Sequence, residues 1–254
     1  MAESKIQPTT RDWQGAAIAG CILALWGTLF IYAIFFHPLR VERSLTTLLL
    51  VAALTFLNTG LFITAHDAMH GVVFPPNRRF NDGIGRLCVF LYAGFDWAFM
   101  RSEHHRHHDQ PGISKADPDF HAEGHPSYMA WYLHFFAHYF RWWQLAGILV
   151  IAVSMQVFLK AEQWNPLTFW ALPGILSSFQ LFTFGTWLPH RRGKISFKDQ
   201  HRARSNQYPH WLSFLTCYHF GYHWEHHKWP YLPWWALPSA RAQSTGDSWK
   251  ASHD

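Results

Sequence analysis

The chain is poor in charged residues. Of its 254 residues only 15% are Asp, Glu, Lys or Arg, whereas 18% are aromatic. The formal net charge is +5, but the basic residues do not gather in one stripe, so we expect no nucleic-acid partner. The mean hydropathy of −0.10 averages long apolar runs with polar, histidine-rich stretches. The apolar runs indicate an integral membrane protein.

Cysteines are also few. Cys21, Cys88 and Cys217 form no CxxC pair, so we expect small buried thiols rather than a disulfide framework. The first 14 residues mix acidic and basic side chains, which predicts no removable signal or transit peptide. There is no internal repeat and no low-complexity tract. The length suits one membrane-embedded domain, predicted at 1–241, followed by a disordered tail at 242–254.

Four apolar runs are candidates for membrane spans. Residues 15–36 and 44–65 carry no charge, and each is long enough to cross a hydrocarbon core of about 30 Å. Residues 142–159 and 166–188 are the third and fourth candidates. Pro173, inside the fourth run, predicts a kink, which membrane helices tolerate when neighbours satisfy the freed backbone groups.

Three further segments lie between the second and third runs. Residues 72–86 contain Pro-Pro-Asn and Asn-Asp-Gly, which predict a loop. Residues 87–100 are apolar but too short to span comfortably, and residues 128–143 are aromatic and amphipathic. We expect residues 87–100 to form a re-entrant or interfacial helix, and residues 128–143 to form a helix in the interface plane.

The basic residues predict an orientation for these spans. One face of the membrane would hold 1–14, 66–141 and 190–254, and the other face would hold 37–43 and 160–165. Only three of the 21 Lys and Arg residues fall on the second face: Arg40, Arg43 and Lys160. The positive-inside rule then makes the first face, with both termini, cytoplasmic. The expected fold is an all-α integral membrane protein with about four transmembrane helices, interfacial helices and a cytoplasmic histidine-rich, metal-binding cap.

Histidines gather in three clusters on that predicted cytoplasmic face. The first is an HxxxH pair, and the other two are HxxHH motifs, whose three ligand positions cover an arc of roughly 100° on a helix. The expected ligands are His66, His70, His104, His107, His108, His223, His226 and His227. His105 lies about 60° beyond that arc and is expected not to be a ligand. Eight imidazoles exceed what one ion with an open position can use, so the clusters predict a two-metal centre, although imidazole suits iron, zinc, copper and nickel alike.

Acidic residues flank these clusters and could orient the imidazoles by accepting their ring N–H groups. They are Asp67, Glu103, Asp109, Asp117, Asp119 and Glu225. Of these, Asp67, Asp117, Asp119 and Glu225 are the expected catalytic-site carboxylates. Ordinary solvation at a helix end is the alternative for any one of them. His134 and His138 form another HxxxH pair, which we assign to the aromatic interfacial helix.

The combination of HxxxH with two HxxHH motifs in a four-span protein resembles the membrane fatty-acid desaturase and hydroxylase superfamily. Residues 66–71 (HDAMHG), 117–120 (DPDF), 182–191 (FTFGTWLPHR) and 219–227 (HFGYHWEHH) more closely resemble bacterial and cyanobacterial β-carotene ketolases. The likeness extends over about residues 62–238. It implies a bacterial inner-membrane or cyanobacterial thylakoid protein.

The resemblance also implies a chemistry. Two non-haem iron ions would use O₂ as oxidant and take electrons from an external, ferredoxin-like donor. C4 of a β-ionone ring would be hydroxylated twice, and the resulting gem-diol would lose water to leave a ketone. β-Carotene from the bilayer would become echinenone and canthaxanthin, and zeaxanthin would become astaxanthin.

Members of this superfamily commonly take a ninth histidine ligand from the last spanning helix. His190, at the end of the fourth run, is the expected ninth ligand. His219 is the alternative, since a helix running over 219–227 would place it on the face of the third cluster. The aromatic stretches 179–187 and 211–222 are expected to wall the slot for the ring.

Other functions are compatible with the histidine clusters. A carotenoid C3 hydroxylase or a fatty-acyl desaturase would show the same ligand spacing, and only the ketolase-like segments favour ketone formation. A histidine-rich metal transporter should hold its ligands near the bilayer midplane, on broken helices. The expected spans carry no histidine at mid-depth.

Overall fold

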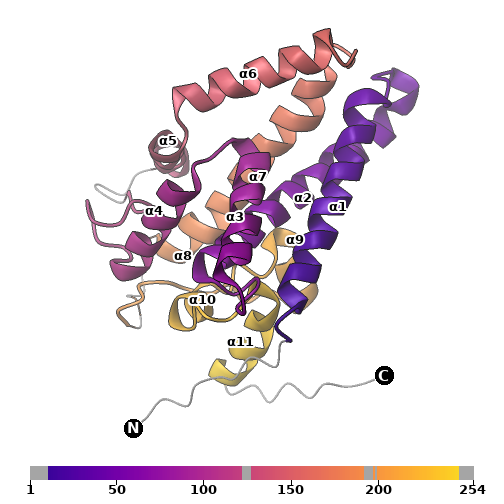
Figure 1. Ribbon diagram of the computed structural model, residues 1–254. Coiled ribbons are helices and arrows are strands. Elements are labelled where there is room, and N and C mark those ends of the chain that lie inside the picture. Colours follow the sequence, from indigo (N-terminus) through magenta and orange to yellow (C-terminus); the bar gives the residue numbers. More distant parts are fainter. Residues whose placement is uncertain (1–10, 122–126, 192–196, 198, 246–254) are drawn as a thin grey trace.

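The computed structural model describes residues 11–121, 127–191, 197 and 199–245, and in these ranges every regular element is helical (Figure 1). The helices are α1 (Gln14–Phe35), α2 (Ser44–His70), α3 (Arg78–Ala93), α4 (Trp97–Asp109), α5 (Tyr128–Tyr139), α6 (Trp142–Val157), α7 (Leu172–Leu181), α8 (Leu188–His190), α9 (His210–Cys217), α10 (His223–Lys228) and α11 (Leu237–Thr245). Shorter helical turns are η1 (Val41–Arg43), η2 (Leu167–Ala171), η3 (Phe182–Trp187) and η4 (Trp234–Ala236).

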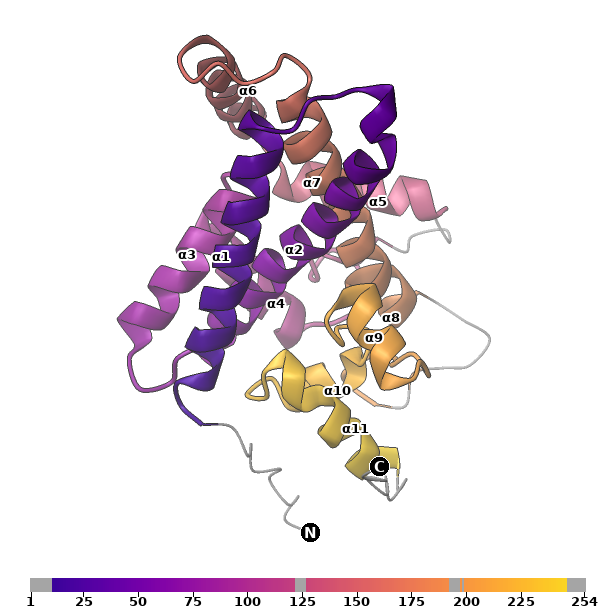
Figure 2. The same cartoon turned by 90° about the vertical axis from the view of Figure 1, so that its right-hand side faces the viewer.

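Helix α2 is the centre of the bundle, packed against α1, α3 and α7 (Figures 1 and 2). Polar bonds join these helices at mid-length. Trp26 Nε1 donates to Asn58 Oδ1 at 3.1 Å, and the Thr59 hydroxyl donates to Gln180 Oε1 at 2.7 Å. Because lipid offers no hydrogen bonds, buried polar groups must find their partners inside the protein. These bonds therefore fix the rotation of α1 and α7 about α2.

The end of α1 is held from a distant part of the chain. The Nδ2 group of Asn165 lies 2.9–3.0 Å from the carbonyl oxygens of Ala33, Ile34 and His37. Carbonyls in the last turn of a helix have no partner within the helix. Asn165 supplies that partner and ties the loop before the last span to the end of the first span.

Within the described ranges, three helical stretches are long and apolar enough to cross a membrane: Gln14–Phe35, Val41–His70 and Leu167–His190. A fourth span results if α5 and α6 count as one broken helix, bent by 78°. The prediction of about four spans is confirmed in this form. The predicted third run, residues 142–159, forms α6, which is too short to span a membrane by itself. An extended break at Phe140–Arg141 separates α6 from α5, and α6 runs across the end of the bundle (Figure 1).

The predicted loop at 72–86 is wrong in its second half. Helix α3 begins at Arg78, because Asn77 Oδ1 caps it by accepting the Phe80 N–H at 3.0 Å. Asn81, taken as part of a turn, lies inside the helix and donates to the carbonyl of Ala68 at 2.8 Å. The predicted helix at 87–100 is also divided, since α3 ends at Gly94 with φ at 65° and Asp96 caps α4.

The last span passes through two prolines without ending. The π-helical turns η2 and η3 each finish two residues before a proline, Pro173 and Pro189. A proline has no N–H to offer the carbonyl four residues earlier, and wider π turns absorb the mismatch. Beyond this span, α11 continues to Thr245, four residues into the predicted tail, and residues 246–254 lie outside the described ranges.

Candidate metal centre

Nine histidines form two adjacent groups at one end of the bundle. In each group, one ring nitrogen from every member lies within 4.8 Å of the others. The first group consists of His66, His70, His104, His108 and His226, and the second consists of His107, His190, His223 and His227. The two groups are in contact, because the rings of His108 and His227 stack with their centroids 4.2 Å apart.

The helix period explains how two HxxHH motifs serve both groups. His104 and His108, four residues apart on α4, face the first group, whereas His107 faces the second. On α10 the arrangement is reversed. His223 and His227 join the second group, and His226 joins the first.

Ring nitrogens in the first group approach one another closely. His66 Nε2 and His226 Nε2 are 3.1 Å apart, and His108 Nε2 and His226 Nε2 are 2.9 Å apart. His70 and His104 meet through their Nε2 atoms at 2.7 Å. Helices α2, α4 and α10 thus aim five imidazoles at one point.

The second group is fully buried and includes a histidine from the last span. His227 Nε2 lies 3.1 Å from both His107 Nε2 and His223 Nε2. His190 Nδ1 bonds to the carbonyl of Arg202 at 2.9 Å. Its Nε2 is buried, has no hydrogen-bond partner among the described residues, and belongs to the same group. That orphaned nitrogen is what a metal ligand requires.

These distances fit metal binding. Nitrogens that each lie about 2.1 Å from one ion are separated by roughly 3 Å. Burial, reinforced by neighbouring imidazoles, lowers the pKa of His104, His108 and His226 well below its usual value. It does the same for His223 and His227. The rings are therefore neutral, the form in which imidazole binds metal.

Two of the predicted carboxylates bond to histidines of these groups. Asp117 Oδ1 accepts His107 Nδ1 at 2.8 Å, and Asp67 Oδ1 lies 3.2 Å from His66 Nδ1. Burial opposes ionisation of Asp117, but the adjacent His107 prevails and lowers the pKa of the carboxyl group. Each bond places the ring proton on Nδ1 and leaves Nε2 for a metal ion.

The other predicted carboxylates lie farther out. Glu225 is buried, but its partners are Ser205, Arg241 and Ser244 rather than an imidazole. Asp119 accepts the Tyr139 hydroxyl and stands 3.8 Å from His107 Nδ1. The carboxylate of Glu103 accepts from His138 at 2.6 Å, and Asp109 is exposed at the end of α4.

His219 does not share the face of the third cluster, because the predicted helix over 219–227 is wrong. Tyr218 and His219 both have positive φ, at 47° and 60°, and the helix begins only at His223. His219 consequently lies outside both groups. His105 also lies outside them and binds the carbonyl of Arg101. His134 stacks on His121, away from the metal groups.

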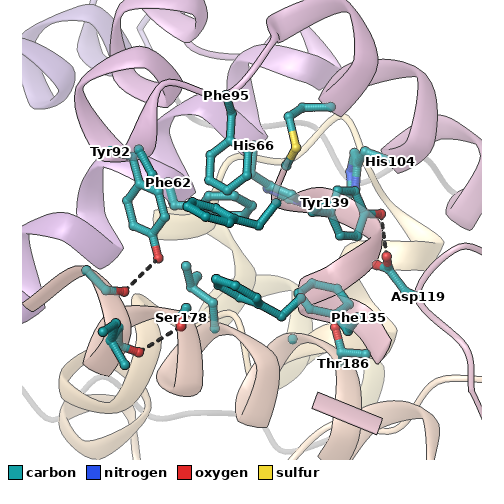
Figure 3. Close-up of a pocket in the computed structure, with 18 of the residues that line it drawn as sticks. Phe62, His66, Tyr92, Phe95, His104, Asp119, Phe135, Tyr139, Ser178 and Thr186 are labelled. Atoms are coloured by element: carbon teal, nitrogen blue, oxygen red, sulfur yellow. Dashed lines mark hydrogen bonds between the residues drawn. The ribbon is translucent and has the colours of Figure 1, made fainter. Parts of the chain in front are cut away.

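An apolar cavity of about 440 Å³ leads to the histidines (Figure 3). His66, His104, His107 and His223, drawn from both groups, form part of its wall. Elsewhere the wall is mostly aromatic and aliphatic, contributed by α2, α3, α5, α6 and the last span. Such a space suits an apolar molecule that reaches the metal groups from between the membrane helices.

Sequence reasoning located this wall only in part. Of the two aromatic stretches, 179–187 contributes Leu181, Gly185 and Thr186, whereas 211–222 contributes Phe220. Tyr92 and Ala93 of α3 and Phe135, Phe136 and Tyr139 of α5 also line it. The aromatic run of α5 was expected to lie in the membrane interface, and no local signal shows that its other face closes a cavity.

Comparisons with known proteins agree with this geometry. The model of the fatty acid desaturase family matches residues 43–160 and 135–248. A β-carotene ketolase of Paracoccus sp. (strain N81106 / MBIC 01143) is 43% identical, covering 89% of this chain and 91% of that protein. β-Carotene 4-ketolase 3 of Haematococcus lacustris is 40% identical, with 94% and 82% covered.

A zeaxanthin 4-ketolase of Chlamydomonas reinhardtii is 41% identical over 94% of this chain, and the chain spans 56% of that longer protein. The family match covers well over half of the chain, and the bacterial relative aligns over almost its full length. The chain belongs to the fatty acid desaturase family, in the branch that holds the curated β-carotene ketolases.

Proposed function

We propose that this protein is a carotenoid 4-ketolase that uses a pair of iron ions. One observation carries the proposal: nine imidazoles, in two touching groups, stand at the end of an apolar cavity between the membrane helices. The names of the relatives supply the substrate class, since they act on β-carotene or zeaxanthin.

The two histidine groups would each hold one iron ion, the first with five ligands and the second with four, including His190. When bound, the iron pair supplies the activation of O₂ that hydroxylation of an unreactive ring carbon needs. Asp67 and Asp117 keep the Nε2 atoms of His66 and His107 directed at the ions. His219 stays outside this ligand set.

The chain's own part is to bring the ring to the iron ions and to keep water out. A long hydrocarbon dissolves in the bilayer, and the cavity lets one ring reach the histidines while the polyene follows along the apolar wall. Each of two hydroxylations at C4 consumes one O₂, two electrons and two protons, and releases one water. The gem-diol then loses water to give the ketone.

The distribution of basic residues supports a cytoplasmic position for the histidine groups and for both termini. An external donor, of the ferredoxin type, would deliver electrons from that side. A bacterial inner membrane or a thylakoid membrane would provide both the carotenoid and the donor.

Pigment analysis tests the proposal. Cells that make β-carotene and express this chain should accumulate 4-keto products. His226→Ala, which removes a ligand nitrogen from the first group, should abolish them. His105→Ala is the matched control, because His105 lies between ligand candidates of the second cluster, His104 and His107, but belongs to neither group.

Other outcomes would contradict the proposal. Carotenoids hydroxylated at C3 without any ketone would assign a different reaction to the same centre. Desaturated fatty acids with unchanged pigment would assign a different substrate. Full ketone formation by His226→Ala would remove the first group from the metal centre.

A further inference from the structure

One hydroxyl group in the cavity lacks a partner. The hydroxyl-bearing residues of the wall are Tyr92, Tyr139, Ser178 and Thr186. Tyr139 donates to Asp119, Tyr92 lies within 3.3 Å of Ser177 Oγ, and Ser178 donates to the carbonyl of Ile175. No hydrogen bond joins the Thr186 hydroxyl to any described residue, although Thr186 is only 4% exposed.

Threonines inside helices often satisfy their hydroxyl with a local backbone carbonyl, and Thr186 does not. In this protein Thr55, Thr183 and Thr216 donate to the backbone carbonyl four residues earlier. That bond is the ordinary resting state of a threonine inside a helix. Thr186 lies in the π-helical turn η3 and does not form it. Its hydroxyl remains available to a molecule in the cavity.

The position of Thr186 indicates which part of a substrate it meets. Thr186 precedes His190 by four residues in the last span, so it lies about one turn from a histidine of the second group. Figure 3 shows Thr186 at the same end of the cavity as His104 and Asp119, with Tyr92 toward the other end. Under the proposed function, the reacting ring carbon rather than the polyene would occupy that end.

We propose that Thr186 binds the C4 hydroxyl group left on the ring by the first oxidation, and so retains this half-oxidised product for the second. The inference rests on the proposed function. A new hydroxyl in an apolar cavity loses its bonds to water and needs a partner. Thr186 can both donate to it and accept from it. Holding the C4 oxygen fixes the remaining C4 hydrogen toward the histidine groups, where the second hydroxylation occurs.

Product partition provides the first test. Thr186→Val keeps the shape of the side chain and removes the hydroxyl. A neutral hydrogen bond changes an equilibrium by roughly 3- to 10-fold, so the ratio of 4-hydroxylated to 4-keto product should rise by about that factor. Thr186→Ser should restore the wild-type ratio. Thr183→Val is the matched control, because Thr183 lies in the same π turn but bonds to Phe179 and Tyr128 and does not line the cavity.

Binding to the iron-free protein provides an independent readout. The affinity for β-carotene carrying a 4-hydroxyl, relative to the affinity for unsubstituted β-carotene, should fall 3- to 10-fold in Thr186→Val. Quenching of tryptophan fluorescence can follow both ligands. Unchanged product and affinity ratios in Thr186→Val would overturn the proposal. A loss confined to 3-hydroxylated carotenoid would also overturn it, by assigning Thr186 to the neighbouring ring position.

These outcomes are separable from failure of the proposed function. If the wild-type protein makes no ketone from β-carotene, the proposed reaction fails. The hydroxyl site would still be established if the wild-type protein prefers the 4-hydroxylated ligand and Thr186→Val loses this preference. Absence of that preference would overturn the site as well.

Discussion

Gly185 is the position where one added methyl group should do most harm to activity. A Cβ atom at Gly185 would lie 2.3 Å from Cε1 and 2.7 Å from Cδ1 of Phe220. Retreat of the Phe220 ring is opposed by His66 and His223, whose ring centroids lie 4.7 and 4.9 Å away, and the ring also borders the cavity. Gly185→Ala must therefore push Phe220 against the histidine groups or into the cavity, or shift the last span.

The magnitude follows from packing. Alanine is favoured over glycine in a helix by about 1 kcal/mol, so the backbone gains slightly. Overpacking costs typically 1–3 kcal/mol, which leaves the fold intact in most cases. Activity is more sensitive, because a reacting group misplaced by about 1 Å can lose on the order of 100-fold in rate. We expect Gly185→Ala to insert normally and to make ketone about 100-fold more slowly.

The assay is the initial rate of ketone formation in isolated membranes, normalised to the amount of folded protein. Gly27→Ala is the control, since its Cβ would meet nothing within 4 Å. Phe220→Leu removes the ring atoms that clash, so combining it with Gly185→Ala should recover part of the rate. A wild-type rate in Gly185→Ala alone would refute the steric argument.

Three further changes probe other parts of the account. Asp117→Ala removes the acceptor of His107 Nδ1 and should weaken metal binding by the second group about 10- to 100-fold. Competition with a chelator measures this affinity, and an unchanged affinity would show that Asp117 does not orient the ring. Removal of iron should lower the unfolding temperature, because the nine-histidine arrangement exists only in the folded chain. Adding Fe(II) should restore the original unfolding temperature. Equal unfolding temperatures with and without iron would contradict ligation by these residues. Asn165→Leu leaves carbonyls at the end of α1 without their partner and should cost about 1–3 kcal/mol of unfolding free energy in detergent, whereas a neutral effect would mean that water replaces the amide.

The clustering of the histidines could be predicted from sequence because metal binding imposes local spacing. HxxxH and HxxHH place imidazoles on one helix face whatever surrounds them, so the eight cluster histidines were foreseen. Their division into five and four could not be, since it depends on how α2, α4 and α10 cross. His219 was misjudged because positive φ at Tyr218 and His219 ends the periodicity on which the face argument relies.

The membrane spans were predicted from apolar length, and the errors arose where tertiary contacts override local signals. Asn-Asp-Gly at residues 81–83 reads as a turn, but Asn81 instead bonds to the carbonyl of Ala68 and supports α3. The cavity was the least predictable feature. Its wall joins α3 and α5 to the last span, and no local pattern encodes that meeting. The unpaired hydroxyl of Thr186 likewise emerges only from a full set of hydrogen bonds.

The most direct test of the central claim is the number of iron ions per chain in the purified protein. The account predicts two in the wild type. It predicts one in the variant that combines His66→Ala with His226→Ala, since this change removes two ligands from the first group and none from the second. A single ion in the wild-type protein, or two in that variant, would contradict a centre built from two histidine groups.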